Sequence, residues 1–253
     1  MQKRPLILIT IMTLLLAIGL FASPPATMAI TKVEKTPAPS DELDTQTLLD
    51  QAIEKVNAQD YESAIDDLNA VIERDETIHD AYFFRGVAYS QTGDENRAID
   101  DYTRALIIVP YDWTTYALRG DLYFFTEDLV EADFDYDQAL FYQPRYAPAI
   151  AGKAILSLQQ GDEDRALVYQ AVYEGLQASI SGDNDETLTI LSDAIDNFDA
   201  QSRPVELGYA YYNRANTYIS QSNYDDALVD LSIAIDLQPH MQNYYMARGY
   251  VYS

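Results

Sequence analysis

The 253-residue chain has 41 acidic against 16 basic residues, a formal net charge of −25. This excess repels phosphate backbones and anionic lipid surfaces, so it argues against nucleic-acid binding and attracts basic proteins or peptides instead. The alternative explanation is that this charge serves only to keep the protein soluble. The sequence contains no cysteine, which excludes disulfides, thiol chemistry and zinc–thiolate sites.

The first 29 residues are typical of an export signal. A basic start precedes an apolar run over residues 6–22, which is short for a membrane-spanning helix. Cleavage after Ala29 is one interpretation, and an uncleaved N-terminal anchor, the only membrane contact we expect, is the other. Both place the rest of the protein outside the cytoplasm, either secreted, periplasmic or in the cell envelope. Residues 30–44 are expected to form a flexible linker.

From residue 45 onward the sequence repeats with a period of 34 residues. The segment that starts at Tyr82 and contains Arg85 and Gly86 recurs from Tyr116 onward. Alanine, aromatic and proline residues follow both copies at matching distances. We divide this array into units 45–78, 79–112 and 113–146, an irregular stretch 147–207, a unit 208–241 and a truncated unit 242–253.

This pattern resembles the tetratricopeptide repeat (TPR), in which small and large residues alternate at fixed positions of a helix pair and proline ends it. The resemblance implies an all-α fold, namely a right-handed α-solenoid of stacked antiparallel helix pairs. It also implies a non-enzymatic role in assembling complexes, with peptides or helices held on the concave face that the first helices form.

The residues themselves support helix pairs. Gly93 and Gly161 suit the left-handed turn after a first helix. Aspartate or asparagine recurs where the second helix should begin and is expected to act as its N-cap. These N-cap residues are Asp60, Asp94, Asp128, Asp162 and Asn223.

Arginine recurs at position 7 of the units and aspartate at position 23. We expect each guanidinium to form an ion pair with a position-23 carboxylate of the same or a neighbouring unit, a structural role and not a ligand site. The arginines are Arg85, Arg119, Arg214 and Arg248, and the aspartates are Asp67, Asp101, Asp135 and Asp230.

The repeat pattern breaks between residues 147 and 207. Residues 162–181 fit the second helix of one unit and also the first helix of the next, so one helix is missing from an even count. We expect either a long shared helix or an irregular three-helix insertion. Two ordinary repeats that have lost their pattern are the alternative.

Patterns that would carry catalysis or metal binding are weak. His79 and His240 lie in turns between units and are too distant to form a dyad. The aspartates at 133, 135 and 137 lie on one predicted helix, so their carboxylates should point around its axis. The acid-rich residues 182–186 depart from a calcium loop and are typical of a helix N-terminus. We therefore expect no enzyme activity, no metal and no cofactor.

The resemblance places positions 2, 5, 9 and 12 of each first helix on the exposed concave face. None of these positions carries the lysine or arginine that similar arrays use to clamp a terminal carboxylate. They form instead an aromatic and aliphatic strip edged by acids, which suits a basic peptide with apolar anchors. Packing of the aromatic residues against the next unit is the alternative. The candidate binding residues are Asp80, Phe83, Val87, Ala117, Asp121, Phe124, Tyr209, Tyr212 and Asn216.

Two hypotheses for the function follow. The first is an exported scaffold that binds basic or apolar peptides or helices on its concave face. The second is that the array is the N-terminal TPR region of a larger multidomain protein whose activity lies downstream of Ser253, which falls within a unit.

Overall fold

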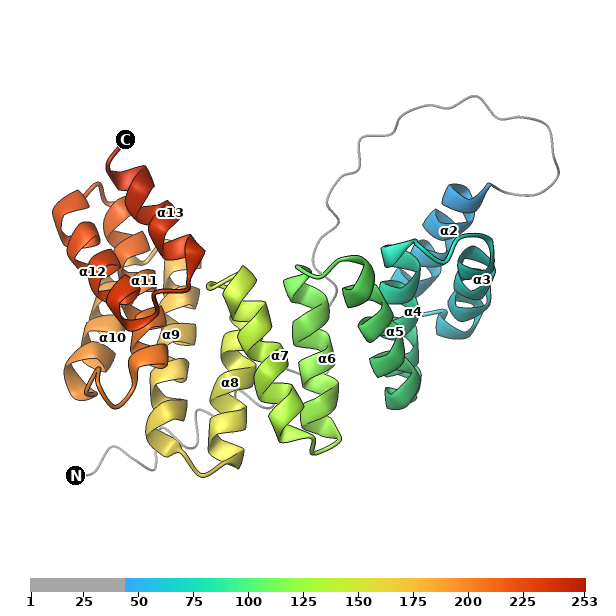
Figure 1. The fold of residues 1–253 in the computed structure, drawn as a ribbon, viewed down its shortest axis with the longest axis horizontal. Coiled ribbons are helices and arrows are strands. Elements are labelled where there is room, and N and C mark those ends of the chain that lie inside the picture. The colour runs from blue at the N-terminus through green and yellow to red at the C-terminus, as the bar shows by residue number, and fades with distance from the viewer. Residues whose placement is uncertain (1–43) are drawn as a thin grey trace.

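Twelve α-helices and no strand make up residues 44–253, the part of the chain that the computed structural model describes. Successive helices pack against each other, and this confirms the predicted all-α solenoid of helix pairs (Figure 1). The proposed export signal and residues 30–43 of the linker lie outside the described residues. The helices are α2 (Thr45–Asn57), α3 (Tyr61–Arg74), α4 (His79–Thr92), α5 (Glu95–Ile108), α6 (Trp113–Phe125), α7 (Leu129–Tyr142), α8 (Ala147–Gln159), α9 (Glu163–Ile180), α10 (Asn184–Asn197), α11 (Pro204–Ser220), α12 (Tyr224–Leu237) and α13 (Gln242–Val251).

The predicted capping is confirmed for two of the five residues. Asp60, Asp128 and Asn223 also stand at the N-cap position, but their side chains accept no capping hydrogen bond. Asp94 and Asp162 precede α5 and α9, and each carboxylate accepts a hydrogen bond from the backbone amide three residues ahead at 3.1 Å. Asp183 caps α10 in the same way at 3.0 Å, so the acid-rich stretch is a helix N-terminus. Gly93 and Gly161 have φ angles of 79° and 78°, and the expected left-handed turns are confirmed.

A tyrosine from the second helix fills the space over a glycine of the first. A Cβ atom added to Gly86 would lie 2.7 Å from the ring of Tyr102. The ring of Tyr136 lies over Gly120 of its own unit and also beside Gly152 of the next, where an added Cβ would come within 2.5 Å. Glycine is therefore required for the close approach of these helices.

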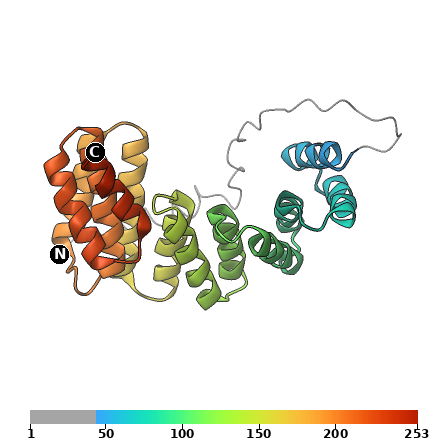
Figure 2. The same cartoon turned by 45° about the horizontal axis from the view of Figure 1, so that its top comes forward.

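The superhelix has an open part and a compact part (Figures 1 and 2). Helices α2 to α7 stack as successive layers, and their buried residues include two separate clusters. Helices α9 to α13 gather into one block, which we call the compact block. Its core is continuous with that of α6 to α8, from Ala117 to Tyr244.

Helix α9 explains the break in the repeat pattern. It has 18 residues, against 14 in α7 and α12. It packs against α8 before it, and against both α10 and α11 after it. Helix α9 is thus the second helix of one pair and the first helix of the next, which is the long shared helix among the alternatives considered above.

Candidate protein-binding surface

The nine predicted binding residues fall into two groups. Five are accessible, since Asp80 and Asp121 are exposed and Val87, Phe124 and Asn216 are partly buried. The other four are at most 9% exposed, so the prediction that they lie exposed on the concave face is wrong. These four are Phe83, Ala117, Tyr209 and Tyr212.

Phe83 is buried because it belongs to the contact between α4 and its neighbours. Its ring meets Phe84 edge to face, with the centroids 5.1 Å apart, and Tyr102 lies 6.2 Å away. Ala117 is part of the core that begins in α6. Aromatic pairs of this kind stabilise a core, so substitution of Phe83 would change stability and not only binding.

Tyr209 and Tyr212 are covered by helices of the compact block. The ring of Tyr212 stacks on Tyr244 of α13 with centroids 4.6 Å apart, and Tyr209 lies 6.3 Å from Tyr169 of α9. The Nδ2 of Asn216 donates to the carbonyl of Tyr212 at 2.7 Å. The alternative stated above, that concave aromatics pack against other helices, therefore holds for this part of the array.

A long-range contact closes the inner side of the compact block. The Nδ2 of Asn243 donates to the carbonyl of Phe141, 102 residues earlier, at 3.4 Å and to that of Tyr142 at 3.3 Å. The ring of Phe141 stacks on His240 with centroids 6.3 Å apart. The start of α13 thus rests on the end of α7.

Four of the five accessible residues lie on α4 and α6, and the fifth, Asn216, lies on α11 in the compact block. We call the surface to which the repeat register assigns Asp80, Val87, Asp121 and Phe124 the open groove. Desolvation by the surrounding protein raises the pKa of Asp121 to about 6. The hydroxyl of Tyr136, which donates to Oδ1 of Asp121 at 2.7 Å, opposes this shift. The carboxylate side chain nonetheless remains in contact with solvent and can receive a positively charged group.

His79 lies next to Asp80 of the open groove and links the start of α4 to the start of α6. Its Nδ1 is 2.8 Å from Oδ1 of Asp80, and its Nε2 is 3.1 Å from Oδ2 of Asp112, the N-cap of α6. Burial favours the neutral imidazole, but the hydrogen bonds and charges of Asp112 and Asp80 outweigh burial and raise the pKa of His79 to about 9.

Replacement of His79 by glutamine should make stability depend less on pH. The folded pKa lies above the unfolded value of about 6.5, so this stabilisation is complete below about pH 6.5 and is lost as the pH rises through about 9. We expect His79→Gln to lower the free energy of unfolding by about 1–2 kcal/mol near pH 6 and to change it little near pH 10. Urea unfolding at both pH values tests this, and a loss that does not change with pH would contradict it.

Arginine–aspartate pairs hold the units together as predicted. Nε and Nη2 of Arg119 each donate to the carboxylate of Asp135 at 2.8 Å, and Nη1 donates to Oγ1 of Thr103 in the preceding unit at 2.9 Å. The same-unit ion pair is confirmed for three of the four arginines, as Arg85 with Asp101, Arg119 with Asp135, and Arg214 with Asp230. Arg248 lies over the ring of Tyr245 at 5.6 Å and forms no such pair within residues 44–253. In the first unit, Asp67 binds Lys55 instead at 2.6 Å.

Lys153 departs from this pattern and was missed by the sequence analysis. It occupies position 7 in α8 and has no exposed surface. Its Nζ lies 2.6 Å from one oxygen each of Asp133 and Asp137. The expectation that the aspartates at 133, 135 and 137 point around the helix is therefore wrong for two of them, because residues four apart share a helix face. The available signal was Tyr169, which replaces the position-23 aspartate in this unit.

Metal and membrane sites were sought in the same range. Within residues 44–253, histidine, aspartate and glutamate form no group of three or more that could hold a metal ion. None of the helices there combines the length and the apolar character needed to cross a bilayer.

Residues 49–112 and residues 208–241 each match a family model described as the tetratricopeptide repeat. No curated protein matches the chain. Among solved structures, a tetratricopeptide repeat protein from Parabacteroides merdae is 16% identical with a TM-score of 0.47, and the alignment covers 85% of this chain and 87% of that one. YrrB, described as a TPR protein with an unusual peptide-binding site, is 19% identical with a TM-score of 0.42, and 81% and 92% are covered. TTC0263 from Thermus thermophilus is 15% identical with a TM-score of 0.42, and 82% and 98% are covered.

Proposed function

Because this chain is a tetratricopeptide-repeat protein, we propose that it is a non-enzymatic scaffold, exported from the cytoplasm, that binds a basic protein or peptide in its open groove. The net charge of −25 supports a basic partner. Long-range attraction of this kind raises association rates and depends on salt.

The observation that carries this proposal is the composition of the open groove. The exposed acids Asp80 and Asp121 lie on successive first helices, and each shares its helix with a partly buried apolar side chain, Val87 on α4 or Phe124 on α6. Apolar side chains next to carboxylates match a peptide that presents apolar anchors beside lysine or arginine. The concave surface of the compact block is filled by its own aromatic residues, so the ligand site is assigned to the open groove.

Binding can be tested with a synthetic amphipathic helix of leucine, alanine and lysine, with a glutamate version of the same peptide as the control. We expect the lysine peptide to bind, more weakly as salt rises, and the glutamate peptide not to bind. Phe124→Ala should weaken binding by about 1–3 kcal/mol because it removes an anchor, and Asp121→Asn should reduce the salt dependence. Titration calorimetry would measure both effects.

Phe134→Ala provides a matched control, since Phe134 is 57% exposed on α7 and lies outside the groove. Thermal unfolding should show that all three variants remain folded. Equal binding by wild type and Phe124→Ala, or equal weakening in Phe134→Ala, would show that the groove is not the binding surface.

Export is supported by the basic start and apolar run of the sequence. Replacement of Leu14, Leu15 and Leu16 by aspartate should retain the protein in the cytoplasm, because it destroys the apolar segment that the export machinery recognises. Cell fractionation with an antibody to the array would measure this. Appearance of the variant outside the cytoplasm at the wild-type level would refute the export signal.

A further inference from the structure

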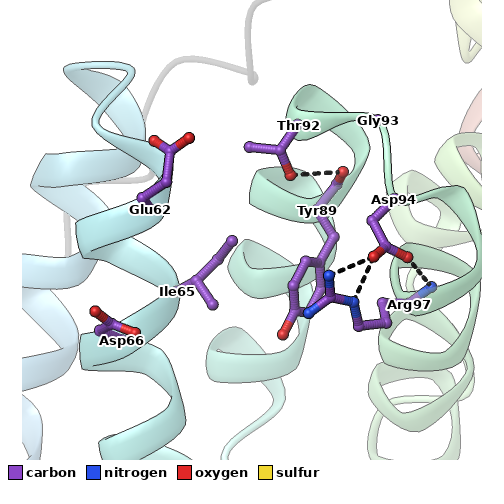
Figure 3. A pocket seen from close by; sticks show the side chains of 8 residues that line it. All are labelled: Glu62, Ile65, Asp66, Tyr89, Thr92, Gly93, Asp94 and Arg97. Carbon is purple, nitrogen blue, oxygen red and sulfur yellow. Dashed lines mark hydrogen bonds and ion pairs between the residues drawn. The ribbon is translucent and has the colours of Figure 1, made fainter.

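A notch that none of the groove residues lines lies between the first two units. It has a volume of about 410 Å³ and lies between α3 on one side and the end of α4 with the start of α5 on the other (Figure 3). Helix α3 contributes Glu62, Ile65 and Asp66, and Tyr89 and Arg97 stand opposite. The notch thus combines an aliphatic side chain, an aromatic ring and charges of both signs.

The charged side chains on the two sides of the notch differ in whether they already form ion pairs. The Nε of Arg97 donates to Oδ2 of Asp94 at 2.5 Å, and its guanidinium lies 4.4 Å from the centroid of the Tyr89 ring. Glu62 and Asp66 are exposed, and neither takes part in an ion pair within residues 44–253. Figure 3 accordingly shows interactions around Arg97 and none at the two carboxylates. The arginine is neutralised, and the notch keeps two unpaired negative charges.

The corresponding place between the second and third units is built differently. Asn96 and Asp100 stand where Glu62 and Asp66 stand in the first interface, which leaves one carboxylate at these two positions. Glu131 replaces Arg97, so no guanidinium covers the ring of the equivalent tyrosine from that position. The repeat thus provides an internal comparison in which the backbone arrangement is kept and the side chains differ.

We propose that this notch is a second docking site, which receives an arginine or lysine side chain of a basic peptide. Glu62 and Asp66 are four residues apart and share one face of α3, so both carboxylates can approach one cationic head. The alkyl part of the incoming side chain packs against the partly buried Ile65, on the side of the notch that faces Tyr89. The inference rests on the proposed basic partner but uses a different surface, so a longer ligand could occupy the groove and the notch together.

Methyl NMR can test this site directly, with isotope-labelled isoleucine and valine methyl groups in the full array. The probe is a short capped peptide with arginine between two leucines, and the control replaces arginine with citrulline, its neutral isostere. We expect a saturable shift of the Ile65 methyl resonance with the arginine peptide alone. The double variant Glu62→Gln and Asp66→Asn should weaken this binding by about tenfold, and Asp100→Asn should leave it unchanged.

Two internal reporters separate this inference from the groove proposal. Ile99 occupies the position of Ile65 in the next interface, and Val87 lies in the open groove. A shift at Ile65 without one at Val87 supports the notch and counts against the groove. A shift at Val87 alone, an equal shift at Ile99, an equal response to citrulline, or undiminished binding by the double variant would overturn the notch site.

Discussion

Replacing Arg119 with methionine is expected to lower the free energy of unfolding by about 3–5 kcal/mol. The guanidinium makes two hydrogen bonds to Asp135, whose side chain is only 1% exposed. Methionine fills similar space but leaves the carboxylate buried without a counter-charge. Urea unfolding of the array at neutral pH would measure the loss.

The pH dependence distinguishes loss of the charge partner from loss of packing. Burial already raises the pKa of Asp135 in spite of Arg119, and without the arginine that pKa rises further. The penalty is complete above the raised folded pKa and is relieved as the pH falls through it, so the variant should approach wild type as the pH falls into the acidic range. Adding Asp135→Leu should recover much of the loss at neutral pH. A loss independent of pH and unchanged by Asp135→Leu would contradict the ion-pair explanation.

The helix pairs could be predicted because local chemistry recurs at fixed spacing. Asp94 caps a helix, and Gly93 with its φ of 79° turns the chain before it, without help from distant residues. The partners of Arg119 were equally accessible to prediction, since positions 7 and 23 of one unit must face each other in any antiparallel pair of this length. Repetition therefore makes predictable those contacts whose residues recur at the same positions in several units.

The concave face could not be predicted in the same way. The positions of Tyr209 and Tyr212 in the 34-residue repeat indicate that both side chains point inward. They do not indicate which residues lie opposite. Their partners, Tyr169 and Tyr244, come from α9 and α13. These helices reach α11 in the compact block, where α9 is shared between two pairs and the regular order of the repeat is lost. Four of the five accessible residues lie in the part in which the repeats stay regular, although Phe83 and Ala117 are buried there as well.

Lys153 marks the transition between these two parts. The lysine stem lies in the core of α8, and its head crosses to α7 and not to its own second helix. In the next layer, Nε of Arg165 on α9 donates to Glu206 of α11 at 2.8 Å, and its Nη2 lies 3.4 Å from Asp133. A connected set of charges therefore links α7, α8, α9 and α11 where the array turns compact.

Replacing Lys153 with alanine should lower the free energy of unfolding by about 3–5 kcal/mol, because it leaves a cavity and removes the cation between Asp133 and Asp137. Lys153→Met keeps the buried stem, and the carboxylates of Asp133 and Asp137 are 30% and 46% exposed. This variant should therefore lower the free energy of unfolding by only about 2 kcal/mol. Adding Asp133→Asn and Asp137→Asn to Lys153→Met should then recover part of that loss, since the repulsion disappears with the charges. Urea unfolding of the four proteins would compare these effects. Equal losses for alanine and methionine, or no recovery with the asparagines, would mean that Lys153 does not act through its packing and its two carboxylates.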